Sequence, residues 1–250
     1  MREILVSPNF LLFHMSYIRV TFRKSAKKDF ETLRAFTKDA KYDNGRNLNW
    51  AVFNKYPQLK IYFDKNKQYK IKNKKALHYF IYEAHRSKQI DMNRALMQHK
   101  KCWEKIAPYY FPLVDHLFSG RKWPQGKYVA FGTIWGMYPR FLEDKTFQVP
   151  FWHRIPRYIP VVIAHELLHF MFYDYFYSHY PKYKNHKYDF KVWDISEAFN
   201  VLIQNSPKWL RVFKQKCVSY PEHKQLIQKM NGIWRGKQDI DYLLKRILQS

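Results

Sequence analysis

The sequence predicts an α+β protein that is mostly helical and carries a small antiparallel sheet. Three observations predict this class. Apolar residues recur at helical spacing through residues 74–117 and again in several segments after residue 159. Two β-forming segments, 128–137 and 146–151, stand just before a long apolar run. With 46% hydrophobic residues, only 7 glycines and no Gly/Ser/Pro-rich linker, residues 1–250 are expected to fold as a single domain.

The N-terminal part, residues 1–127, is expected to be mainly helical. Residues 2–6 are a candidate short strand. Ser25 is a favourable N-cap for a helix over about 27–39, because its hydroxyl can accept from a free backbone N–H. The helical pattern over 74–117 has apolar stripes that should face the core, with lysines and arginines on the solvated face.

The two β-forming segments predict a hairpin immediately before the next helix. A polar break at 139–145 separates them. Pro150 cannot donate to a strand ladder, which favours an edge position or a strand end. An extended peptide could pair with such an open edge, and a hairpin that only supplies packing is the alternative.

The most informative residues lie at 165–169, which read His-Glu-Leu-Leu-His inside an apolar run that follows Pro160. On a helix, His165 and His169 project from one face, about 6 Å apart along the axis. Their nitrogens could share one zinc ion at about 2.0–2.1 Å each. Glu166, about 100° around the helix, can then act as general base on a water held by the metal. The alternative is a core helix whose histidines only bond to their neighbours.

A catalytic zinc site needs a third protein ligand, and the sequence offers two candidates. Glu197 lies in an apolar helical segment over 192–204, and it belongs to a polar stripe at helical spacing. The other members of the stripe are Asp194, Asn200 and Gln204. His186 lies in a lysine-rich loop. Glu197 is favoured because metal ligands usually come from rigid elements, but spacing alone leaves both open.

Residues 128–205 resemble the zincin metallopeptidases, in their compact gluzincin-like form of strand, motif helix and glutamate-bearing helix. The matching residues are His165-Glu166-Leu167-Leu168-His169, and Glu197 within Ser196-Glu197-Ala198-Phe199-Asn200. The resemblance implies His165, His169 and Glu197 as Zn²⁺ ligands and Glu166 as catalytic base. Typical gluzincins carry an aspartate four residues after the glutamate, where this chain has Val201. His186 and Phe190 resemble more weakly the SprT-like proteases, which act on DNA-bound proteins. Residues 206–250 are expected to add C-terminal helices.

The expected function is therefore that of a zinc-dependent metallopeptidase with a peptide or protein substrate. A donor for the oxyanion would come from a side chain near the site, and the sequence does not rank the candidates. These are Tyr173, His179, His186 and Tyr188. Two other classes stay open: a non-catalytic binding module with a zincin fold, and a nucleic-acid-associated protein in which the motif is incidental.

Charge and targeting patterns bear on partners and location. With 45 Lys and Arg against 20 Asp and Glu, the net charge is +25. Such a field attracts nucleic acid, anionic membrane surfaces or acidic substrates, although codon bias is an alternative origin. Cys102 and Cys217 lie far apart and match no metal or redox spacing, and the N-terminus shows no clean signal-peptide pattern. We expect a cytoplasmic protein without a transmembrane segment, because the apolar run at 159–177 contains several ionisable residues.

Overall fold

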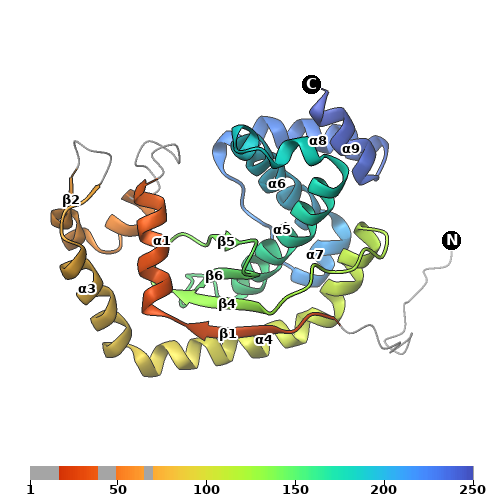
Figure 1. Ribbon diagram of the computed structural model, residues 1–250. Helices are drawn as coiled ribbons and strands as arrows, with labels where there is room; N and C mark the ends of the chain where they lie inside the picture. The colour runs from red at the N-terminus through yellow and green to blue at the C-terminus, as the bar shows by residue number, and fades with distance from the viewer. Residues whose placement is uncertain (1–16, 39–48, 65–69, 250) are drawn as a thin grey trace.

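The computed structural model describes residues 17–38, 49–64 and 70–249, so the expected strand at 2–6 lies outside the described residues. A small central sheet separates one group of helices near the N-terminus from a larger C-terminal group, and the long helix α4 runs along both (Figure 1). The helices are α1 (Ala26–Lys38), α3 (Lys74–Ser87), α4 (Gln89–Leu117), α5 (Ile159–His179), α6 (Asp189–Gln204), α7 (Pro207–Phe213), α8 (Lys224–Gly236) and α9 (Ile240–Leu248). The strands are β1 (Val20–Lys24), β2 (Phe63–Asp64), β3 (Lys70–Ile71), β4 (Tyr128–Thr133), β5 (Arg140–Phe141) and β6 (Thr146–Pro150). Short helical turns lie at Asn49–Phe53, Pro57–Tyr62, Pro156–Tyr158, Pro181–Lys184, His186–Tyr188 and Pro221–His223.

The mostly helical α+β class is confirmed. Helix α1 begins where its N-cap predicted, since the Ser25 hydroxyl accepts a 3.1 Å hydrogen bond from the Lys28 backbone N–H. The helical stretch at 74–117 is present as α3 and α4, which are separated at Lys88. Among the described residues, no helix is both long and apolar enough to cross a membrane.

The predicted antiparallel hairpin of 128–137 with 146–151 is wrong. These segments form β4 and β6, which are neighbours but run parallel, in a sheet of order β1-β4-β6-β5. β1 also pairs with β4 in parallel, and only β5 runs antiparallel to β6. The hairpin that does exist joins β5 to β6 through a turn that ends at Lys145, whose φ is 54°.

Burial in the N-terminal part explains the parallel pairing. After β4, Ile134 and Trp135 are each 1% exposed and belong to the N-terminal core, and the Gly136 N–H donates to the Ala51 carbonyl at 2.8 Å. The chain therefore leaves the sheet after Thr133 and returns on the other side of β6. Pro150 is the last residue of β6, as its missing N–H favours.

Two apolar cores lie on either side of the sheet. The C-terminal core is built around α5 with parts of α4, α6, α7 and α9, and the N-terminal core gathers residues from α1, α3 and the turn at Asn49–Phe53. Phe22 of β1 packs against both. Phe170 of α5 packs against Tyr128 of β4 and Phe147 of β6, at ring-centroid distances of 5.3 and 6.2 Å. This contact sets α5 across the sheet.

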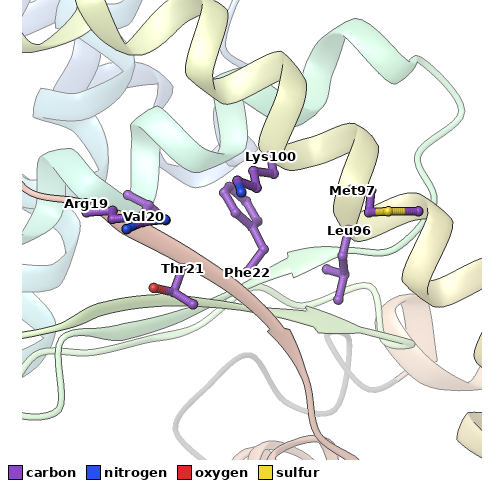
Figure 2. Close-up of a pocket in the computed structure, with 7 residues that line it drawn as sticks. All are labelled: Arg19, Val20, Thr21, Phe22, Leu96, Met97 and Lys100. Carbon is purple, nitrogen blue, oxygen red and sulfur yellow. The ribbon is translucent and has the colours of Figure 1, made fainter.

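A hollow lies where the edge strand β1 faces α4 (Figure 2). Its lining residues are Arg19, Val20, Thr21, Phe22, Leu96, Met97 and Lys100. None of them is a histidine, cysteine or carboxylate, so these lining residues offer no usual metal ligand.

Candidate metal centre

Helix α5 presents both motif histidines on one face. Pro160 in its first turn suits the start of a helix, where a missing N–H costs nothing. The His165 and His169 rings lie 4.7 Å apart between centroids. One potential ligand atom from each of His165, Glu166 and His169 lies within 4.8 Å of the others. The helix is buried on most of its surface, so these polar groups lie inside the protein.

Helix α6 brings Glu197 to both histidines. Its Oε2 lies 3.0 Å from His165 Nε2, and its Oε1 lies 3.3 Å from His169 Nε2. Donor atoms held at about 2.0–2.1 Å around one tetrahedral ion are separated by roughly 3.3 Å, so the observed spacing fits a shared metal. The side chain of His186, by contrast, is 99% exposed and bonds to Asp189, three residues along. Of the two predicted third ligands, the structure places Glu197 at the site and His186 away from it.

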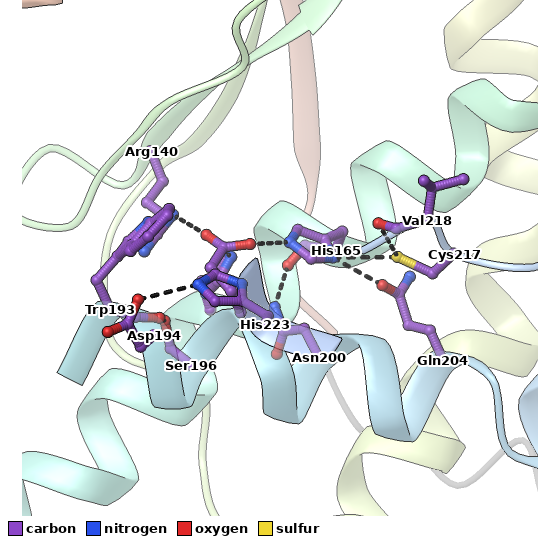
Figure 3. A network of polar contacts seen from close by, with 12 residues as sticks. Arg140, His165, Trp193, Asp194, Ser196, Asn200, Gln204, Cys217, Val218 and His223 are labelled. Atoms are coloured by element: carbon purple, nitrogen blue, oxygen red, sulfur yellow. Dashed lines mark hydrogen bonds and ion pairs between the residues drawn. The ribbon is translucent and has the colours of Figure 1, made fainter. Parts of the chain in front are cut away.

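A second hydrogen bond orients the His165 ring. The Gln204 Nε2 donates to the Val161 carbonyl at 3.0 Å, so its Oε1 is the atom that faces His165 Nδ1, at 2.9 Å. Nδ1 must then carry a proton, which leaves Nε2 to face the Glu197 carboxylate (Figure 3). In neutral imidazole Nε2 is an acceptor, so a proton or a metal ion must lie between it and Glu197. Metal-binding histidines are commonly fixed by such a partner on the other ring nitrogen.

Unpartnered atoms at the site also fit a bound cation. Both ring nitrogens of His169 and the Oε2 of Glu166 are buried and make no hydrogen bond. His169 Nε2 lies 3.3 Å from Glu197 Oε1, and it is the nitrogen that one shared ion would bind. Buried polar atoms without partners cost about 1–3 kcal/mol each, so such groups usually have a ligand. Burial, together with the nearby Arg140 charge, lowers the pKa of His169 to about 3. The ring is therefore neutral, which is the form that binds metals.

Glu166 has the properties of a general base. Its side chain is buried, and burial raises its pKa to about 8 although His165 and Arg140 act in the opposite direction. A carboxyl group with a pKa near neutrality can both accept and return a proton during one reaction cycle. Glu197 differs. Burial would raise its pKa, but the Arg140 charge and the hydrogen bond with His165 act against that effect. The pKa lies well below the usual range, so Glu197 is an anion.

Arg140 is a site residue that the sequence analysis missed. It lies on β5, and its Nη1 donates to Glu197 Oε1 at 2.9 Å while its Nη2 donates to the Tyr173 hydroxyl oxygen at 3.0 Å. Ser196 Oγ donates to the same hydroxyl oxygen at 3.2 Å. In the sequence Arg140 falls in the polar break between the two β-forming segments, and no local pattern connects it to Glu197.

The predicted oxyanion donors are mostly displaced from the site. The Tyr173 hydroxyl is near, but it is engaged with Arg140 and Ser196. The His179 ring bonds to the Tyr175 carbonyl at 2.8 Å and is exposed, and His186 is exposed. Tyr188 packs on Tyr183 in the loop before α6, with ring centroids 4.8 Å apart. None of these last three contacts the motif histidines in the described hydrogen bonds.

A different phenol, Tyr220, packs against Trp193 of α6. Its ring packs on Trp193 and His223 at 5.6 and 5.5 Å between centroids, and His223 is in turn bonded to Asp194 at 2.9 Å. Burial raises the pKa of the Tyr220 hydroxyl, and the charges of Glu197 and Glu166 raise it further. The phenol is therefore protonated and can donate. It comes from the loop before α8, which the sequence did not connect with the motif.

Helix α6 is fixed against α5 by polar contacts as well as by apolar packing. Asn200 Nδ2 donates to the His165 carbonyl at 2.9 Å, and Gln204 Nε2 donates to the Val161 carbonyl at 3.0 Å. The predicted polar stripe therefore faces the site through Glu197, Asn200 and Gln204.

Comparison of the chain with protein families, with curated proteins and with solved structures found no match.

Proposed function

We propose that the protein is a zinc-dependent metallopeptidase. The observation that carries the proposal is the convergence of His165, His169 and Glu197 at spacings suited to one ion. Glu166, buried beside them with a raised pKa, adds the base that a purely structural metal site does not need.

His165, His169 and Glu197 would hold the metal. Bound zinc would supply a water with a pKa near about 7 and polarise the scissile carbonyl. Glu166 takes a proton from the attacking water and returns it to the leaving amine. The protonated Tyr220 hydroxyl is our candidate donor to the oxygen on which negative charge develops.

The sheet supplies a path for an extended substrate. β5 forms one edge of the four-stranded sheet, and its Arg140 contacts Glu197. A peptide that paired with this edge would therefore pass the proposed metal ligands. Peptide main chain is a better match for such an edge than a compact small molecule, which supports a peptide or protein substrate.

The proposal is tested by elemental analysis of purified wild type and of the variants His165→Ala, Glu197→Ala and His186→Ala, with folding checked by circular dichroism. We expect about one zinc per chain in wild type and in His186→Ala, and loss of zinc in the other two. His186→Ala is the matched control, because it removes a histidine that lies away from the site. A folded wild type that also refuses added zinc would contradict the proposal.

A second candidate function, association with nucleic acid, has one local observation in its favour beyond the net charge of +25. Trp152 is 39% exposed, and the ammonium groups of Lys88 and Lys55 lie 5.6 and 6.0 Å from its ring centroid. An exposed indole flanked by cations suits a base that stacks while its phosphates are neutralised. The test is binding of a single-stranded oligonucleotide at several salt concentrations. Trp152→Ala should weaken it, whereas Tyr109→Ala, which removes another exposed aromatic residue, should not.

A further inference from the structure

Arg140 is the one cation in hydrogen-bond contact with the proposed metal ligands among the described residues. Its side chain is 13% exposed, and its partner Glu197 is 6% exposed. A guanidinium in this position is expensive to bury unless its donors are used, and two of them are used, on Glu197 and on Tyr173. The contact is therefore specific in geometry rather than a loose surface pair.

Glu197 contacts Arg140 while its carboxylate oxygens keep the distances to His165 and His169 that would suit one shared metal ion. Glu197 Oε1 receives Arg140 Nη1 at 2.9 Å and still lies 3.3 Å from His169 Nε2, while Oε2 lies 3.0 Å from His165 Nε2. The guanidinium thus approaches the carboxylate without drawing it away from either histidine. A carboxylate has room for both partners, since its two oxygens offer about four lone-pair directions.

The other end of the guanidinium is also fixed. Tyr173, one turn beyond His169 on α5, receives Arg140 Nη2 and also the hydroxyl of Ser196 on α6. Arg140 on β5 therefore connects the edge strand with both helices that carry the proposed ligands (Figure 3). A lysine could not reproduce this arrangement, because it offers a single point charge instead of a planar fork.

We infer that Arg140 is a positioning residue of the metal centre, which holds the Glu197 carboxylate in the orientation needed for metal binding through its paired contacts with Glu197 and Tyr173. This inference rests on the proposed function. It adds that the edge strand β5 is coupled to the metal ligands, so that zinc affinity depends on a residue that does not itself bind zinc.

The experiment measures zinc affinity by competition with a chromophoric chelator in wild type, Arg140→Gln, Arg140→Lys and Tyr173→Phe. Partners that orient metal ligands typically change affinity by about 10- to 100-fold when they are removed, and we expect this loss in Arg140→Gln. Arg140→Lys keeps the positive charge and is less prone to misfold, and it should lose less zinc affinity than Arg140→Gln. Tyr173→Phe removes only the second anchor and should have the smallest effect.

Arg121→Gln is the matched control. It removes another arginine–carboxylate pair, in which Arg121 Nε bonds to Asp174 of α5 at 2.7 Å, away from the motif histidines. Its zinc affinity should equal that of wild type. In the cobalt-loaded proteins, the visible absorption bands should change in Arg140→Gln and stay unchanged in Arg121→Gln, because these bands report the geometry of the ligands.

The outcomes separate the two proposals. Wild type that binds no zinc overturns the proposed function and the role of Arg140 with it. Wild type that binds zinc, together with a folded Arg140→Gln of equal or higher affinity and unchanged cobalt bands, overturns only the positioning role. Such a gain would mean that the guanidinium competes with the metal for Glu197.

Discussion

At the scale of single residues, the site depends on how the histidine rings are oriented. His165 is fixed through Nδ1 by Gln204, and Gln204 is fixed in turn by the Val161 carbonyl. His169 has no hydrogen bond on either ring nitrogen. The two proposed ligands therefore differ: one is oriented before any metal binds, and the other would gain its partner from the metal.

Gln204→Leu tests the orientation of His165. The leucine has a similar size but offers no acceptor to Nδ1, so we expect zinc affinity to fall by about 10- to 100-fold. Gln228→Leu, an exposed glutamine on α8, is the control and should leave affinity unchanged. Equal affinity in both variants would show that the Gln204 contact has no effect on metal binding.

Glu166→Gln tests the proposed base. The amide keeps the size of the side chain but cannot take a proton, so peptide hydrolysis should fall by about 10²- to 10⁴-fold while zinc content stays near one per chain. Hydrolysis rates on a mixture of peptides, measured with zinc content on the same samples, check this. A folded variant that keeps full activity would contradict the mechanism, and a wild type that binds zinc without hydrolysing any peptide would favour a binding module.

At the scale of elements, a buried polar network joins α1 to the ends of β4 and β6. The Asp29 carboxylate is fully buried and bonds to His85 Nε2 at 2.7 Å. It also accepts from the Thr133 hydroxyl and from Gln148 Nε2. Helix α3 and strands β4 and β6 therefore meet at one carboxylate of α1. Because Thr133 ends β4, this network contributes to placing the turn that leads the chain back to β5 and Arg140.

Asp29→Ala should destabilise the fold strongly. Removing one partner of a buried ionic network costs about 3–5 kcal/mol, because the other polar groups stay buried without their acceptor. The free energy of unfolding in urea measures the loss. Asp91→Ala is the control, since Asp91 forms an exposed pair with Arg94 on α4, and surface changes of this kind usually stay within about 0.5 kcal/mol. A loss below about 1 kcal/mol in Asp29→Ala would contradict the prediction.

At the scale of the whole molecule, the excess of positive charge is the dominant feature. The 45 basic and 20 acidic residues leave a net charge of +25. The ion pairs of the described residues are few and mostly exposed, so they offset little of this repulsion. Like charges at this density destabilise a compact chain and also attract polyanions.

Added salt should therefore stabilise the protein. Screening lengths fall from about 30 Å at 0.01 M to about 8 Å at 0.15 M, so repulsion between distant charges is largely removed in this range. We expect the midpoint of thermal unfolding to rise between these two concentrations of sodium chloride. Sucrose at matched osmolality is the control for non-ionic effects. A midpoint that is flat or falls with salt would show that attractive ion pairs outweigh the repulsion.

The sequence by itself determined the parts of this protein that depend on local pattern. Helical periodicity predicted α3 and α4, and the apolar run after Pro160 predicted α5. The Ser25 cap predicted the start of α1, and the spacing of His165 and His169 placed both rings on one face. These features need only the geometry of one helix, in which positions three and four residues apart are neighbours. The polar stripe on α6 was visible for the same reason.

Only the tertiary structure decided the direction of strand pairing and the surroundings of the histidines. The pairing of β4 with β6 is parallel because Trp135 is buried in a core built by distant residues, which no pattern within 128–151 records. Glu197 rather than His186 lies at the histidines, and Arg140 and Tyr220 join it from other elements. Such contacts join residues far apart in the chain, and packing of the whole fold, rather than local backbone geometry, brings them together.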